Sequence, residues 1–106
     1  MSLMKRQIWY LQLLMRTRSK DQRRVLLDTI TNEQLRALTE VTHNILQGNI
    51  PLTASHKRKL RTEKTFLQIL GDIKAPLVKK REAFCGKADI VVLLLKAAAP
   101  RLKLFL

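Results

Sequence analysis

Residues 56–64, HKRKLRTEK, place five cationic side chains and one carboxylate within nine positions. The cations are Lys57, Arg58, Lys59, Arg61 and Lys64. Ammonium and guanidinium groups form charge-assisted hydrogen bonds with phosphate oxygens, so such a run can hold a polyanion. On a helix, Lys57, Arg61 and Lys64 recur at i, i+4 and i+7, which predicts one cationic stripe. A run of this kind is equally typical of a solvated helix face.

Shorter cationic clusters lie elsewhere in the chain. They contain Arg16, Arg18 and Lys20, then Arg23 and Arg24, then Lys79, Lys80 and Arg81. The chain has 21 Lys and Arg against 8 Asp and Glu, a formal net charge of +13. Because several like-charged clusters in one small domain repel each other, we expect the fold to bring them together on a polyanion.

Double-stranded DNA is the predicted partner, held through its phosphates without reading of base sequence, and possibly condensed. Lys and Arg pair with phosphates whatever the bases are. The five aromatic residues do not alternate with the basic runs as the stacking platforms of single-strand binders do. The thirteen cations named above are therefore the predicted nucleic-acid contacts.

No enzymatic chemistry is expected from the remaining reactive residues. Glu40 and His43 have the i, i+3 spacing of di-iron bundles, but the second such motif and the further glutamates are missing. Cys85 is the only cysteine, which excludes an intramolecular disulfide and favours an intracellular reducing compartment. The sequence therefore predicts a protein without a metal, a cofactor or a catalytic site.

The elements that must position these cations are predicted to be helices. Glycines, prolines and capping residues separate segments of helical periodicity, and no alternating strand pattern persists. We expect one all-α domain over 1–106, a compact bundle of about five to six short helices. Their predicted ranges are 3–17, 19–30, 31–48, 53–71, 76–86 and 87–99, and 100–106 is predicted to form a flexible tail, a strand-like arm or a docking peptide.

Two predicted helices are apolar on more than one side. Range 3–17 is apolar nearly all round, and the last helix contains IVVLLL at 90–95. Such helices need cover on several sides, from the same domain or from a second copy. Trp9, Leu13, Val92 and Leu94 are therefore the predicted interface of a homo-oligomer.

Two other functions remain open at this point. In the first, the protein is an adaptor or oligomerisation module that docks a partner through its apolar helices, while its charge confers solubility. In the second, the cationic and apolar segments 1–18 and 87–106 insert into an anionic membrane surface. A transmembrane helix is not expected, because the longest purely apolar run has six residues where a span needs about 20.

The stretch NILQGNIPLTASHKRKLR, with KKREAF further on, resembles small basic proteins of adintoviruses and Maverick-like elements that are likened to the adenovirus core peptide. The matching residues are Asn44, Gly48, Pro51, Leu52, Lys57, Lys59, Leu60, Lys80 and Arg81. The chain departs from that pattern at Thr62, Glu63 and Thr65 in the basic helix, and in having Gly86 alone near its end. The resemblance implies a DNA-binding role in a viral core, in the nucleus and in particles.

Overall fold

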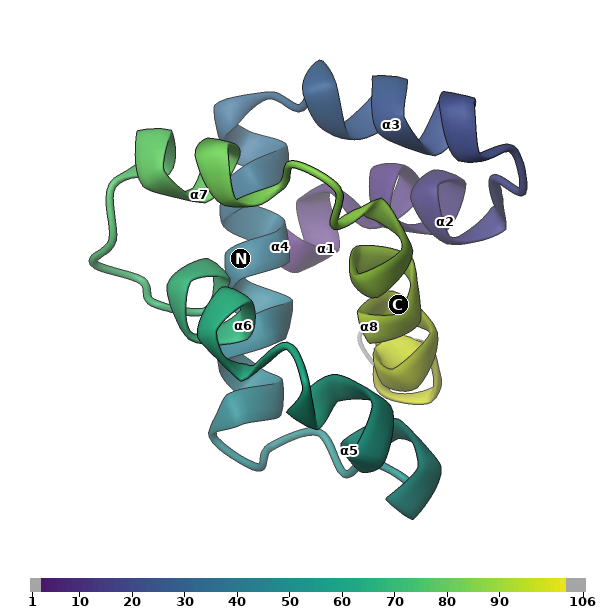
Figure 1. The fold of residues 1–106 in the computed structure, drawn as a ribbon, viewed down its shortest axis with the longest axis vertical. Coiled ribbons are helices and arrows are strands. Elements are labelled where there is room, and N and C mark those ends of the chain that lie inside the picture. Colours follow the sequence, from purple (N-terminus) through teal and green to yellow (C-terminus); the bar gives the residue numbers. More distant parts are fainter. Residues whose placement is uncertain (1–2, 103–106) are drawn as a thin grey trace.

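The protein is all-helical in the computed structural model, which describes residues 3–102, without the side chains of 101 and 102. Eight helices follow one another through the described part (Figure 1). They are α1 (Leu3–Arg6), α2 (Ile8–Arg16), α3 (Lys20–Asp28), α4 (Asn32–Leu46), α5 (Ala54–Arg61), α6 (Lys64–Leu70), α7 (Leu77–Ala83) and α8 (Ala88–Leu102). The all-α prediction is confirmed, but the helices exceed the predicted five to six.

The additional helices arise because two predicted helices are divided. Range 3–17 is interrupted at Gln7, whose φ of −109° and ψ of 20° separate α1 from α2. Range 53–71 is interrupted at Thr62 and Glu63. The Thr62 hydroxyl donates to the Lys59 carbonyl, and the Glu63 N–H bonds to the Leu60 carbonyl three residues back. These local bonds compete with the i to i−4 pattern and end α5.

The helix ends follow capping signals that are visible in the sequence. Ser19 and Thr53 each accept a backbone N–H at the start of α3 and α5. Thr31 and Gln34 form a complete capping box at the start of α4. Gly48 adopts a φ of +77° just after α4, a conformation that glycine adopts without strain.

The core lies between α4 and α8. Helix α4 packs against α1, α6 and α8, while α8 also contacts α2, α3 and α5, so that helices of both halves of the chain surround it (Figure 1). The fully buried side chains include Leu35, Leu38 and Val41 of α4 and Val91 and Leu95 of α8. The molecule has a radius of gyration of 12.5 Å and nearly equal extents of 31, 30 and 29 Å.

The prediction that α8 contributes to an oligomer interface is corrected by its position in the core. Val92 is 3% exposed and Leu94 is fully buried, because neighbouring helices of the same chain cover them. Trp9 and Leu13 on α2 remain 57% and 43% exposed. The apolar character of α8 thus reflects burial within one chain, and only the α2 pair is available to a second copy.

The end of α8 differs from its predicted boundary. The helix continues through Pro100 to Leu102, although proline lacks the N–H that would bond to the carbonyl of Lys96. Residues 100–102 are therefore helical, and the rest of the predicted tail, 103–106, lies outside the described residues. Among the described helices, none combines the length and the apolar character needed to cross a bilayer.

Candidate nucleic-acid interface

Helix α5 is a short surface helix that presents most of its residues to solvent. Leu60 is its one buried side chain, and the preceding connection is fixed to the core by Ile50. The Thr53 hydroxyl accepts the N–H of His56 at 3.1 Å, which caps the first turn. One buried side chain, one cap and packing against α8 therefore hold a helix most of whose residues are exposed.

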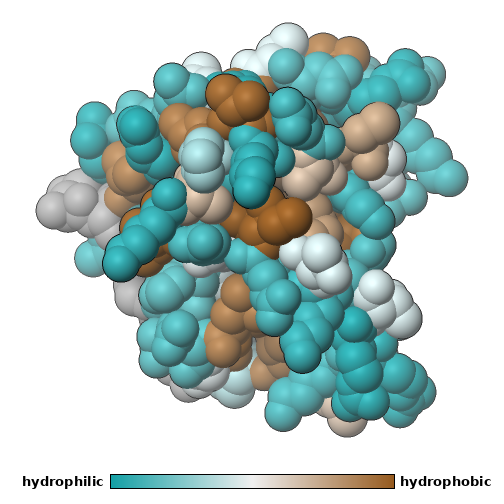
Figure 2. All heavy atoms as spheres, turned by 60° about the vertical axis from the view of Figure 1, so that its left-hand side comes forward, coloured by the Kyte–Doolittle hydropathy of each residue, from teal (hydrophilic) through white to brown (hydrophobic). Residues whose placement is uncertain are grey.

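The cations of α5 and the start of α6 are exposed and have no acidic partner among residues 3–102. Lys57, Arg58, Lys59, Arg61 and Lys64 are all exposed. None of the four ion pairs among residues 3–102 includes any of them. We call these five residues the α5 surface. Helix α5 lies at the lower end of the molecule in Figure 1, and Figure 2 shows hydrophilic side chains at that end.

The nearest carboxylate in sequence is turned away from this surface. Both oxygens of Glu63 accept hydrogen bonds from Lys87 Nζ, at 2.8 and 2.9 Å, and the Glu63 side chain is largely buried. Because Lys87 already neutralises Glu63, the positive charge of the α5 surface is not reduced by it. This pairing was not predicted, since the two residues are 24 positions apart.

Part of the cationic excess also serves the helix itself. Arg58, Lys59 and Arg61 occupy the last turn of α5, where the carbonyl end of the helix dipole favours positive charge. The predicted stripe of Lys57, Arg61 and Lys64 does not form on a single helix, because Lys64 begins α6 after the break at Thr62 and Glu63. The cations therefore lie on two consecutive helices.

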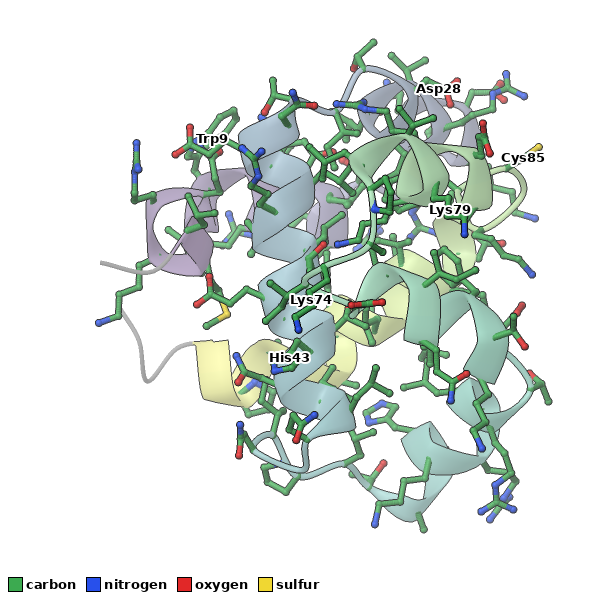
Figure 3. The ribbon with its side chains drawn as sticks, turned by 90° about the vertical axis from the view of Figure 1, so that its left-hand side faces the viewer. Trp9, Asp28, His43, Lys74, Lys79 and Cys85 are labelled. Carbon is green, nitrogen blue, oxygen red and sulfur yellow. The ribbon has the colours of Figure 1, made fainter. Side chains whose placement is uncertain are left out.

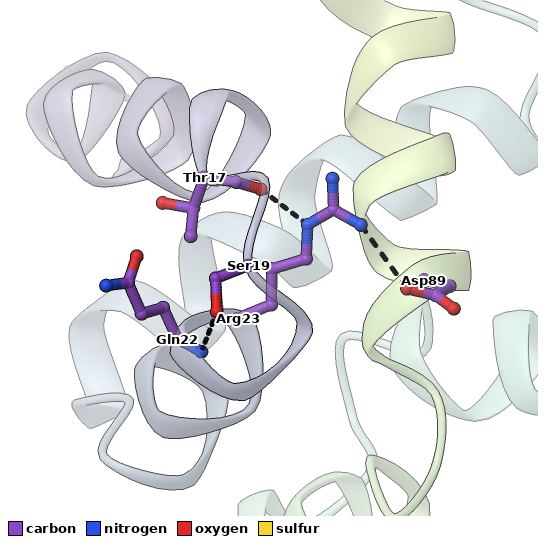
Figure 4. Close-up of polar contacts among 5 residues, drawn as sticks. All are labelled: Thr17, Ser19, Gln22, Arg23 and Asp89. Carbon is purple, nitrogen blue, oxygen red and sulfur yellow. Dashed lines mark hydrogen bonds and ion pairs between the residues drawn. The ribbon is translucent and has the colours of Figure 1, made fainter.

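The predicted cations around the α2–α3 turn differ in exposure and in their partners among the described residues. Arg16, Arg18 and Lys20 are exposed. Arg23 is mostly buried: its Nε donates to the Thr17 carbonyl at 2.5 Å and its Nη1 to Asp89 Oδ1 at 3.3 Å (Figure 4). The guanidinium thus joins the α2–α3 turn to α8, and we correct its predicted role from DNA contact to structural link.

Arg24 is exposed but has an acidic neighbour on its own helix. Its Nη2 lies 3.5 Å from Asp21 Oδ1, at i, i+3. An exposed pair of this kind contributes little to stability, yet it lowers the local positive charge that a polyanion would meet.

The third predicted cluster contains one cation, Lys79, that has no hydrogen-bond or ion-pair partner among the described residues. Lys79 is exposed (Figure 3), whereas Lys80 is 2% exposed and its Nζ donates to Thr39 Oγ1 at 2.9 Å. Burial lowers the pKa of the Lys80 ammonium. Arg81 donates to the Ile30 carbonyl at 2.7 Å and to Asn32 Oδ1 at 2.6 Å. The predicted phosphate contacts at Lys80 and Arg81 are therefore corrected: both side chains connect α7 to α4 or its N-terminal end.

The surface between α3 and the end of α7 is charged but balanced. A cavity of about 700 Å³ lies there. Its lining includes the cations Lys20, Arg24 and Arg81 and the acids Asp21, Asp28, Glu82 and Asp89. We call this region the α3–α7 surface. It lies at the end of the molecule opposite α5 in Figure 1, so the fold does not join the predicted clusters into one face.

The residues considered for metal or acid–base chemistry have structural partners. Glu40 Oε2 accepts the backbone N–H of Met4 at 3.1 Å, and His43 Nδ1 lies 3.2 Å from the Gly71 carbonyl. Within the described part of the chain, no group of three or more His, Cys, Asp or Glu side chains could hold a metal ion. Cys85 is exposed.

No protein-family model, curated protein or solved structure matches this chain.

Proposed function

We propose that the protein binds double-stranded DNA through phosphate contacts made by the α5 surface. The supporting observation is that Lys57, Arg58, Lys59, Arg61 and Lys64 are exposed together, unpaired with any carboxylate among the described residues. Charge of this kind attracts a polyanion and gains free energy when DNA releases its condensed counterions. The resemblance to viral core proteins described above is consistent with this role. We include in the proposal the location that the resemblance implies, in the nucleus or in virions.

The contacts are proposed to be independent of base sequence. An eight-residue helix is about 12 Å long, which reaches only a few successive phosphates. Its side chains on the exposed faces are mainly flexible Lys and Arg, which neutralise phosphates without fixed geometry toward base edges. We therefore expect little difference between unrelated duplexes.

Condensation of DNA would require a second cationic site on the same molecule. Arg16, Arg18 and Lys20 are exposed near the α2–α3 turn, and α3 and α5 lie at opposite ends in Figure 1. One copy could thereby contact two duplexes. A dimer that forms through Trp9 and Leu13 could also contact two duplexes, because it would carry two α5 surfaces.

The adaptor alternative is favoured by one specific observation, the exposure of Trp9 and Leu13 at i, i+4 on α2.

The membrane alternative has less support. Met4, Leu11 and Leu14 of the first segment and Val91 and Leu95 of the last are buried in the core. They would have to leave the core before they could enter a membrane surface.

The test is fluorescence anisotropy of the full chain with two unrelated duplexes over a salt series. DNA binding by phosphate contacts gives similar affinities for both duplexes and a steep fall of log K with log[salt]. If neither duplex is bound near physiological salt, the proposal is wrong, and vesicle binding and partner capture then distinguish the two alternatives.

A further inference from the structure

A second cavity lies between α4 and the segment that connects α6 to α7, on the side of the molecule turned forward in Figure 3. Its volume is about 590 Å³, within the range of small-molecule sites. Its lining includes the polar residues Arg36, Thr39 and Lys80 and the apolar residues Leu3, Ile73 and Leu77. Figure 2 views the molecule from a direction close to that of Figure 3, and it shows hydrophobic side chains near the centre of this face.

The lining of the cavity includes a buried ammonium group with hydrogen-bond donors that no described residue accepts. Lys80 is 2% exposed, and the one hydrogen bond that its ammonium makes with a described residue is to Thr39 Oγ1. An ammonium has three N–H donors, so two of them lack an acceptor among the described residues. Buried cations are normally paired, because an unpaired one loses its hydration without compensation. An acceptor in the cavity would supply what Lys80 lacks.

Two nearby carboxylates each accept a backbone N–H, and neither is paired with Lys80. Glu40 lines the cavity, but its Oε2 accepts the Met4 N–H. Asp72, which raises the pKa of Lys80 against the larger effect of burial, accepts the Lys74 N–H at 2.9 Å. Neither forms an ion pair with Lys80. Arg36, also in the lining, adds a second positive charge, so the open positions beside Lys80 favour an anion.

The apolar part of the lining is suited to an apolar group. Leu3, Ile73 and Leu77 come from three separate segments, and Ile73 is 65% exposed although it is large and apolar. Covering this side chain would remove apolar area from water, which is favourable. His43 and Lys74 also lie at this side of the molecule (Figure 3).

We propose that this cavity binds a small amphipathic monocarboxylate, with its carboxylate on the Lys80 ammonium and its hydrocarbon chain against Leu3, Ile73 and Leu77. A monoanion matches one buried cation with two free donors. Arg36, Lys80 and Glu40 give the lining a net charge of +1, which one monocarboxylate balances and a phosphate dianion exceeds. The site does not involve the α5 surface and does not depend on DNA binding.

Octanoate and octan-1-ol, which share a chain length, provide the test on the full-length protein. We expect octanoate to shift the backbone amide resonances of Thr39, Ile73 and Leu77, and octan-1-ol to bind at least about tenfold more weakly, because it lacks the charge that Lys80 pairs with. Equal affinities for the two probes, or no binding of octanoate, would overturn the proposal without any variant.

Two neighbouring lysines supply matched variants. Lys80→Met retains the length of the buried chain but removes the ammonium, and we expect it to reduce octanoate affinity about tenfold or more. Lys79→Met removes the same charge from an exposed position and is expected to leave the affinity within about twofold. Equal losses in both variants would mean that octanoate responds only to net charge. Resonance shifts confined to α5 would likewise contradict the assignment.

Discussion

The α5 surface and the α3–α7 surface are both rich in Lys and Arg, but their charges are arranged differently. On α5, five exposed cations have no carboxylate partner among the described residues. On the α3–α7 surface, three cations share a cavity with four acids, and Arg81 also donates to neighbouring backbone and side-chain oxygens.

The difference shows that a basic cluster in sequence is not yet a basic surface in space. Clusters such as KRKLR and KKR look alike in the chain. The first keeps its charge in solvent, whereas two of the three cations in the second are drawn into contacts with α4 or its N-terminal end. The two clusters differ because residues distant in sequence provide partners for the cations of KKR but not for those of KRKLR. Sequence spacing does not reveal such partners.

The largest expected effect comes from reversing charge on α5. Replacing Lys57, Arg61 and Lys64 with Glu should lower the affinity for any duplex by roughly two to three orders of magnitude at 0.1 M salt, since each lost phosphate contact removes about 0.9 from the salt slope. Fluorescence anisotropy across a salt series measures both quantities.

The matched control reverses three cations elsewhere. Arg24, Lys74 and Lys79 are exposed, and Arg24 lies among the carboxylates of the α3–α7 surface. Their replacement with Glu changes the net charge by the same amount but should weaken binding much less. Equal losses in the two triple variants would show that net charge, and not the α5 surface, determines affinity.

Replacing one arginine of the α3–α7 surface and one of the α5 surface should have opposite effects: the first should reduce stability, and the second should reduce DNA binding. Arg81→Gln removes donors from the buried Ile30 carbonyl and from Asn32, and should reduce the free energy of unfolding by about 2 kcal/mol. Arg58→Gln should change it by less than about 0.5 kcal/mol while weakening DNA binding. Chemical denaturation and anisotropy measure the two effects, and a destabilised Arg58→Gln would contradict the distinction.

The two N-caps allow a smaller comparison of the same kind. Thr53→Ala and Ser19→Ala each remove a hydroxyl that accepts a backbone N–H, and each should cost about 1 kcal/mol in unfolding free energy. Only Thr53→Ala should also reduce DNA affinity, because it loosens the helix that carries the α5 surface. Thermal unfolding and anisotropy would show whether the second effect follows the cap.

The smallest expected effect is a gain. Asp21→Asn with Glu82→Gln removes two acids from the α3–α7 surface and should raise duplex affinity by roughly threefold at low salt, with a steeper salt slope. Anisotropy at two salt concentrations tests this. No gain would mean that the cations there are too few or too constrained to hold a phosphate even when their acids are removed.

Local signals in the sequence predicted much of the fold. Ser19, Thr31, Thr53 and Gly48 mark helix ends because capping depends on residues close together in the chain, and the structure uses each of them. The all-α class followed for the same reason. The break at Thr62 and Glu63 was missed, because the apolar periodicity continued across it.

The candidate site was predictable only in part. The exposure of Lys57 and Arg61 follows from their position beside Leu60 on an amphipathic helix. The burial of Lys80 depends on Thr39, 41 positions away, and the link from Arg23 to Asp89 spans 66 positions. Val92 and Leu94 were assigned to an oligomer for the same reason, since no local pattern distinguishes cover by the same chain from cover by another.

The nearly equal extents of the molecule have a consequence for stoichiometry on DNA. A body about 31 Å long would occupy a stretch of duplex that carries about 18 phosphate charges, at one charge per 1.7 Å. One copy brings a formal charge of +13. A duplex covered end to end along one side would therefore keep a net negative charge, so a single row of copies would coat DNA without neutralising it.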